Sequence, residues 1–252
     1  MRQLQGQDLL LAWERGTAPS RVPALHRALA MLEAACPEYS RDALAALTVT
    51  ARDRMLLQLR ELSFGPRLDC CFDCLQCGET LEFSASTYAL LAAGEREMQA
   101  SVEAGAAQVP FAGYRLTLRE ASTDDVEIAA SAADDAAALR MLAERCVQVE
   151  DDEGQCVAAQ AWSPALLDHA IGRLEQLHDA LLMVLKFDCP ACGCHDAQPF
   201  DAAAFVWNEV SHRAQQLLDD VHALAWTYGW SEAAILGMHA RRRQAYLERA
   251  GL

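Results

Sequence analysis

The sequence predicts a mainly α protein with a small β component, and three observations support that class. Of the 252 residues, 52% are apolar but only 7% are aromatic, and alanine and leucine, both strong helix formers, supply most of the apolar count. Apolar residues recur at helical spacing over several long stretches. Alternation of apolar and polar residues, which indicates strands, is confined to short stretches, most of them beside two distant cysteine pairs.

Residues 1–66 are expected to form a helical N-terminal region. The stretch GQDLLLAWERG predicts a first helix that ends at Gly16, and Pro23 is well placed in the first turn of a second helix. Ser40 is expected to cap a short third helix. Thr50 is expected to cap the fourth helix, ARDRMLLQLREL.

Residues 67–84 and 186–202 are each expected to form a short β hairpin around a Cys-x-x-Cys-Gly turn. The first has its turn at QCGE, and the TLEF that follows alternates as a strand does. The second contains FDCPACGCHD followed by AQPFD. These two segments are interpreted as the two halves of one small β unit.

Residues 85–185 are expected to form an inserted α+β segment between those halves. The pattern predicts a helix over residues 86–104 and a strand at YRLTL. Thr123 is expected to cap one continuous helix, DDVEIAASAADDAAALRMLAERC. Ser163 followed by Pro164 predicts the start of a long helix, since a cap followed by proline is a preferred beginning.

Residues 203–252 are expected to form a helical C-terminal region. One long helix is predicted to end at Gly229. Ser231 is expected to cap the next helix, and a final helix is predicted to end against Gly251.

Cys74-x-x-Cys77 and Cys189-x-x-Cys192 are two turns of the same design, called knuckles below. A tetrahedral zinc ion binds four thiolates, and each knuckle presents two sulfurs to one ion. Loop-closure entropy grows only logarithmically, so the long interval between the pairs is no obstacle. The sequence therefore predicts a discontinuous four-Cys zinc ribbon that joins the helical N- and C-terminal parts. A closed set of four thiolates has a structural role.

Other thiols near the knuckles leave alternatives open. Cys71-x-x-Cys74 has the same spacing, and Cys70, Cys194 and His195 stand close by, so a variant ligand set or a cluster without metal is an alternative. A redox dithiol is a further one. Thioredoxin-type dithiols begin a helix after a strand, whereas these motifs are cysteine–glycine knuckles, which favours zinc.

The charge of the chain limits its partners. Its net charge is −15, so its surface repels phosphate backbones, and we expect no nucleic-acid partner. A zinc-ribbon nucleic-acid-associated protein or transcription cofactor is kept as the alternative function. No stretch reaches the roughly 18 to 20 apolar residues that span a bilayer, so we expect no membrane partner. No signal peptide is recognised, and a cytoplasmic location is expected.

Candidate partner-binding residues lie near the C-terminus, and no catalytic motif is found. Tryptophan and tyrosine dominate binding hot spots, and an arginine run suits an acidic partner. These candidates are Trp226, Tyr228, Trp230, Arg241, Arg242 and Arg243. The alternatives are a packing role for the aromatic residues and a solvated helix end for the arginines. The chain has no G-x-S-x-G, P-loop or G-x-G-x-x-G motif, so we expect no enzymatic activity.

Several stretches carry a resemblance to a known family. ARDRMLLQLRELSFGPRLDCCFDCLQCGETLEF, FDCPACG and YGWSEAAILGMHARRRQAYL together resemble the baseplate hub assembly chaperone family of T-even-like contractile phage tails and phage-tail-like contractile injection systems. The resemblance implies a non-enzymatic assembly factor or minor component whose partners are baseplate hub or spike proteins. It also implies incorporation into an assembled particle as an alternative to a cytoplasmic location. The extra cysteines of DCCFDC depart from the pattern and leave open which thiols bind metal.

Overall fold

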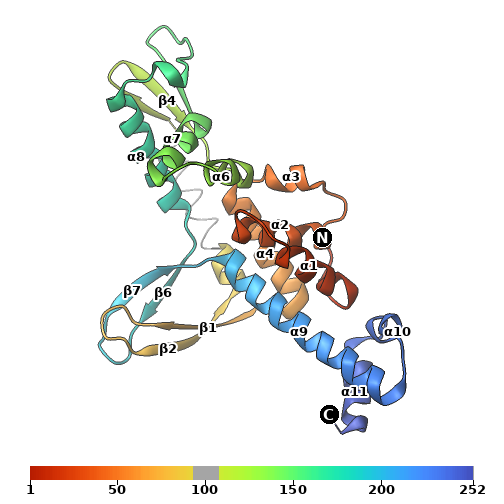
Figure 1. The fold of residues 1–252 in the computed structure, drawn as a ribbon. Coiled ribbons are helices and arrows are strands. Elements are labelled where there is room, and N and C mark those ends of the chain that lie inside the picture. Colours follow the sequence, from red (N-terminus) through yellow and green to blue (C-terminus); the bar gives the residue numbers. More distant parts are fainter. Residues whose placement is uncertain (93–107, 252) are drawn as a thin grey trace.

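The structure is a computed structural model that describes residues 1–92 and 108–251 (Figure 1). Its helical core is built from N-terminal helices and one long C-terminal helix. These are α1 (Gln7–Thr17), α2 (Pro23–Ala35), α3 (Arg41–Ala45), α4 (Val49–Phe64) and α9 (Ala202–Tyr228). Leucines of α2 and α4, among them Leu29, Leu32 and Leu56, are fully buried against Val206 of α9. The first and last parts of the chain therefore share one core.

The starts of these helices follow the sequence, with one correction. Pro23 lies in the first turn of α2 and Ser40 caps α3, as predicted. The cap of α4 is Thr48, so the prediction of Thr50 was wrong. Thr50 lies inside the first turn, where its backbone N–H donates to Glu120 Oε1 at 2.6 Å. A carboxylate 70 residues away therefore satisfies a helix N–H that the sequence assigned to no partner.

Gly16 does not end α1, which continues to Thr17. A Cβ added at Gly16 would lie 2.3 Å from the ring of Trp207 on α9. The glycine is therefore a point of close helix–helix approach, and the prediction that it stops the helix was wrong.

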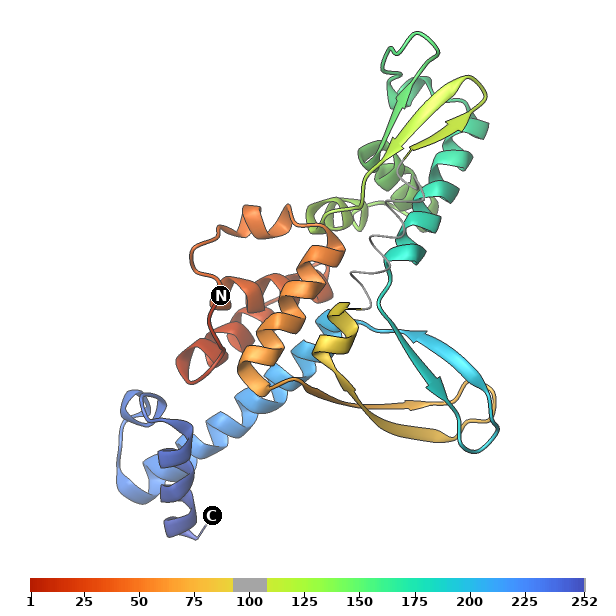
Figure 2. The ribbon, with the colours of Figure 1, turned by 180° about the vertical axis from the view of Figure 1, so that it is seen from behind.

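Two antiparallel hairpins leave the helical core on the same side and converge at their turns (Figure 2). The first pairs β1 (Arg67–Asp73) with β2 (Thr80–Ser86), and the second pairs β6 (Val184–Asp188) with β7 (His195–Pro199). Each hairpin is a sheet of two strands. Leu57, Leu68 and Met183 pack together at their bases. The hairpins therefore touch the core at one end and each other at the opposite end.

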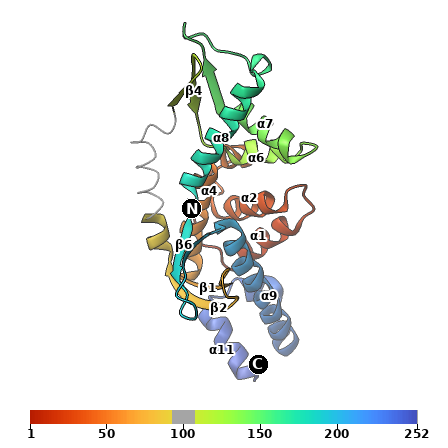
Figure 3. The same cartoon turned by 90° about the vertical axis from the view of Figure 1, so that its left-hand side faces the viewer.

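The chain between the hairpins contains a third sheet with its own apolar core. Its strands β3 (Gln108–Phe111), β4 (Tyr114–Leu118) and β5 (Val147–Glu150) are antiparallel in the order β3-β4-β5. Buried Leu116 and Val149 pack with Leu166 of α8 (Pro164–Leu181). The short helix η1 (Ala159–Ala161) precedes α8, whose start at Ser163 and Pro164 follows the prediction. Figure 3 shows this sheet and α8 at the end of the molecule opposite α11.

The predicted continuous helix after Thr123 is wrong, because two helices stand there. α6 (Thr123–Ala129) is capped by Ser122, and α7 (Asp135–Cys146) is capped by Asp134. The helix predicted over residues 86–104 lies largely outside the described residues, although residues 87–92 are helical.

A buried carboxylate holds the start of α6 in place. Asp125 is 1% exposed and forms ion pairs with Arg119 and Arg145, each at 2.6 Å. It also accepts hydrogen bonds from the backbone and hydroxyl of Ser122. Burial alone would raise the pKa of Asp125, but hydrogen bonds from Arg119, Ser122 and Arg145 outweigh it and hold that pKa well below its usual range.

Two short helices pack against the end of α9. α10 (Glu232–Leu236) is capped by Ser231, and α11 (Ala240–Ala250) ends at Gly251, as predicted. Leu224, Ile235 and Leu247 form their shared apolar cluster. The chain is thus mostly helical with small antiparallel sheets, which confirms the predicted fold class.

Candidate metal centre

The turns of the two hairpins bring together the four cysteines that the sequence paired. Sγ atoms of Cys74, Cys77, Cys189 and Cys192 all lie within 4.8 Å of one another. The Cys74 and Cys192 sulfurs are 3.8 Å apart, and the Cys77 and Cys189 sulfurs are 3.7 Å apart. A tetrahedral ion with metal–sulfur bonds of about 2.3 Å requires sulfurs about 3.8 Å apart. The four sulfurs therefore fit a single tetrahedral ion.

Both knuckles have the same backbone geometry. Gly78 and Gly193 follow the second cysteine of each knuckle and have φ angles of 75° and 71°, which favour glycine. Each glycine N–H donates to the carbonyl of the first cysteine, Cys74 or Cys189, at 2.8 Å. The Cys-x-x-Cys-Gly sequence thus dictates a local turn that directs two sulfurs to the same side.

Ionisation of the thiols is uneven in this cluster. The backbone N–H of Cys192 donates to Cys189 and, together with that of Ala191, lowers the pKa of the Cys189 thiol to about 7. At Cys77 a hydrogen bond from the backbone N–H of Glu79 lowers the pKa of the thiol. Burial and the neighbouring thiols outweigh this bond and raise the pKa of Cys77 to about 12. The Cys77 thiol therefore resists ionisation beside its neighbours unless a cation compensates the charge.

The surroundings of the cluster are apolar on one side. Cys74 and Cys189 are 2% and 1% exposed, whereas Cys77 and Cys192 face solvent. Phe72 and Phe187, one from each hairpin, pack edge to face with ring centroids 4.4 Å apart. Four thiolates would complete a tetrahedral shell and leave no position for water or substrate. The donor set therefore suits an ion that joins the hairpins.

The four alternative ligands are not among the grouped thiols, although Cys194 packs against Cys74 and Cys189. Cys70 is buried against the hairpin base, and Cys71 is exposed. The Cys194 thiol donates to the carbonyl of His195, whose ring contacts Asp188 on the opposite strand. Within the described part of the chain, these four residues do not join the group of four thiols.

The C-terminal aromatic residues predicted to bind a partner lie in two settings. Trp226 is 86% exposed. The ring of Tyr228 stacks on Trp230 with centroids 4.5 Å apart, and Trp230 meets Tyr246 of α11 edge to face at 4.8 Å. Tyr228 and Trp230 therefore attach α11 to the end of α9, and Trp226 points outward.

The three consecutive arginines, residues 241–243, also lie in two settings. Arg243 forms an ion pair with Asp220 of α9 at 2.9 Å, and its side chain is 13% exposed. Arg241 and Arg242 are exposed. Arg243 therefore holds α11 against α9, and its two neighbours are the ones presented to solvent.

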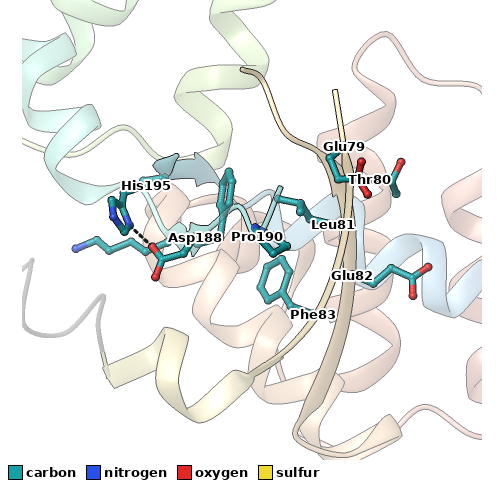
Figure 4. Close-up of a pocket in the computed structure, with 11 residues that line it drawn as sticks. Glu79, Thr80, Leu81, Glu82, Phe83, Asp188, Pro190 and His195 are labelled. Carbon is teal, nitrogen blue, oxygen red and sulfur yellow. Dashed lines mark hydrogen bonds and ion pairs between the residues drawn. The ribbon is translucent and has the colours of Figure 1, made fainter. Parts of the chain in front are cut away.

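A groove between the two hairpins was not singled out by any sequence motif. It has a volume of about 1110 Å³, and β2 and β6 contribute most of its lining. In Figure 4, Leu81, Phe83 and Pro190 lie between the hairpins, and Asp188 contacts His195 at one side. The sequence signal in this region is the alternation of TLEF, which predicts the strand β2 but does not indicate the groove beside it.

No helix in the described part of the chain is long and apolar enough to cross a bilayer.

Comparison with known proteins places the chain in a family. A family model described as T4 bacteriophage base plate protein matches residues 7–207. The match begins with α1, includes both knuckles and ends within α9, so Trp226 and the arginine run lie beyond it. Neither the curated proteins nor the solved structures gave a match. Because the matched residues make up most of its length, the chain belongs to the T4 bacteriophage base plate protein family.

Proposed function

We propose that this protein is a non-enzymatic assembly factor, or a minor component, of the baseplate hub in a contractile phage tail-like injection system. It acts through protein–protein contacts with hub or spike proteins. The observation that carries the proposal is the family match over residues 7–207, which spans both halves of the four-thiol cluster.

The metal in this proposal is a structural zinc ion held by Cys74, Cys77, Cys189 and Cys192. Zinc accepts four thiolates in a tetrahedral shell, and the sulfur separations fit that shell. The ion would join the turns of two hairpins whose bases already rest on the helical core. The hairpins would then form a rigid projection.

A second connection holds the helices that carry these hairpins. Arg60 of α4 donates two hydrogen bonds of 2.8 Å to Glu209 of α9. β1 follows α4 after a short joint, and β7 leads into α9. Zinc at the hairpin turns and the ion pair at their bases would therefore fix the same two segments from opposite ends.

The absence of catalysis is also part of this proposal. Among the residues that the structure describes, the four thiols form the one group of three or more potential ligands. A closed four-thiolate shell supplies no position at which a substrate would be activated. Support for a binding role comes from Trp226, whose exposed ring is typical of a hot-spot anchor.

The proposal is tested by co-purification with hub and spike proteins from the same gene cluster. Tagged wild-type protein is expected to recover at least one of them. Trp226→Ala should lower the recovery, whereas Tyr88→Ala, which alters another exposed aromatic residue, should not. Failure to recover any hub or spike protein under gentle conditions would contradict the proposal, and salt-dependent retardation of DNA or RNA would favour a nucleic-acid role instead.

A further test concerns the finished particle. Mass spectrometry of purified particles and of assembly intermediates would show where the protein resides. Presence in both identifies a component, and presence in the intermediates alone identifies an assembly factor. Absence from both would count against either form of the proposal.

A further inference from the structure

The groove between the hairpins meets the edge of a strand. Five consecutive residues, 79–83, line it from the β2 hairpin arm. Successive side chains of a strand point to opposite faces, so a cavity that touches all of them must run along the strand's edge. Lys186, Phe187 and Asp188 of β6 line the groove in the same consecutive way.

These two edges have no strand partner in the described part of the chain. β2 pairs with β1 alone, and β6 pairs with β7 alone. Alternate residues of an unpaired edge direct their backbone N–H and C=O groups outward, where another strand can bind them. Residues 80–83 of β2 offer an edge about 13 Å long at a rise of about 3.3 Å per residue.

The side chains of the groove indicate what kind of strand would fit. Leu81, Phe83 and Pro190 supply apolar surface between the hairpins (Figure 4). Phe187 lines the same groove. Glu79, Glu82 and Asp188 line the same groove, whose lining also contains the cation Lys186, so its carboxylates are in excess. Apolar side chains at alternate positions of β2 and an excess of carboxylates call for a segment in which apolar residues alternate with Lys or Arg.

We propose that this groove binds an extended, basic segment of a partner protein by adding it as a strand to the edge of β2. A second copy of this chain is a poor occupant, because its net charge of −15 would place like charges together. Nucleic acid is disfavoured for the same reason. The inference rests on the proposed function in that it names the kind of partner segment a hub or spike protein would present.

Zinc binding and groove binding are coupled in this proposal. The groove lies between two hairpins whose turns are joined through the four thiols, and Glu79 follows directly after the first knuckle. Separation of the turns would move β2 away from β6. Loss of the ion should therefore weaken the binding of a strand.

The experiment uses the full chain and a synthetic peptide, acetyl-Gly-Arg-Val-Arg-Val-Arg-Val-Gly-amide, at physiological ionic strength. The first control peptide replaces each Arg with Glu. The second keeps every side chain but carries N-methyl groups on alternate backbone amides, which removes strand hydrogen bonds. Binding is measured by calorimetry, and backbone amide shifts are measured by NMR.

The basic peptide is expected to bind and to shift amides of β2 and β6. The N-methylated peptide should bind at least tenfold more weakly, and the acidic peptide should not bind. Glu79→Gln combined with Glu82→Gln should weaken binding about five- to tenfold. Glu127→Gln combined with Glu248→Gln makes the same charge change at exposed sites elsewhere and should have little effect.

Three outcomes would overturn the inference. The first is an N-methylated peptide that binds as tightly as the unmodified basic peptide. The second is an equal loss of basic-peptide affinity in the two double variants. The third is no binding of the basic peptide at millimolar concentration. Results that refute strand binding in the groove differ from results that refute the proposed function. Capture of hub or spike proteins that is undiminished in the Glu79→Gln, Glu82→Gln variant would refute the groove alone, and peptide binding without any capture would refute the function.

Discussion

The sulfur atoms of Cys74 and Cys192 lie 3.8 Å apart although 118 residues separate them in the chain. They come from different hairpins, and the inserted sheet with α8 lies between those hairpins in sequence. A cross-link at this point defines the molecule's architecture, because it closes the inserted segment into a loop whose two ends are held together. The following predictions test this cross-link and the contacts that accompany it.

Gly16→Ala should destabilise the protein by about 1–3 kcal/mol, because the new Cβ would overlap the ring of Trp207. Gly172→Ala is the matched control on helix α8, where no atom lies within 4 Å of an added Cβ. That substitution should stabilise by about 0.5–1 kcal/mol through helix propensity. Urea denaturation of both variants measures the difference, and equal effects would contradict the close approach of α1 and α9.

Asp125→Asn should lower the free energy of unfolding by about 2–4 kcal/mol, because it leaves two arginines without their buried carboxylate. Asp124→Asn should cost less than about 1 kcal/mol, since Asp124 is half exposed and forms one ion pair. Thermal and chemical denaturation at neutral pH measure both. If Asp124→Asn lowered the free energy of unfolding as much as Asp125→Asn, the role of Asp125 as the buried partner of two arginines would be contradicted.

The Asp125 contribution should depend on pH in a defined direction. The folded pKa of Asp125 lies below its usual range, so the unfolded chain binds this proton more readily. The stability difference between wild type and Asp125→Asn should be constant above about pH 5 and shrink as the pH falls below about 4. Denaturation curves from pH 3 to 8 measure this stability difference. A stability difference that grew toward low pH would contradict the lowered pKa of Asp125.

Arg60→Ala should destabilise the protein by about 3–5 kcal/mol. Its side chain is 5% exposed and binds Glu209 through two nitrogens, so the substitution leaves a carboxylate without its partner. Arg67→Ala removes an ion pair with Asp69 in which both side chains are about 70% exposed, and it should cost less than about 1 kcal/mol. Comparable losses in urea denaturation would contradict a specific connection between α4 and α9.

Features dictated by local chemistry could be predicted from the sequence. A Cys-x-x-Cys-Gly knuckle needs only its own residues to form, so two of them predict a four-thiol group, although Cys70, Cys71 and Cys194 left the ligand set open. The same holds for Ser40 and Ser163 as caps, because each side chain bonds to the helix that follows it.

Features that depend on distant residues could not be predicted. Thr48 caps α4 while Glu120 binds the N–H of Thr50, and no local pattern shows that Glu120 lies there. Gly16 reads as a helix stop in isolation, but it lies within the last turn of α1, where it gives room to the ring of Trp207. The groove has the same origin, since it exists only once β2 and β6 lie beside one another.

The central claim is that one metal ion held by Cys74, Cys77, Cys189 and Cys192 joins the two hairpins. Native mass spectrometry combined with elemental analysis of the purified full chain tests it most directly. We expect one zinc per wild-type chain, loss of that zinc in Cys189→Ser, and full retention in Cys71→Ser and Cys194→Ser. A folded wild-type chain without metal, or a Cys189→Ser chain with unchanged zinc content and stability, would contradict the account.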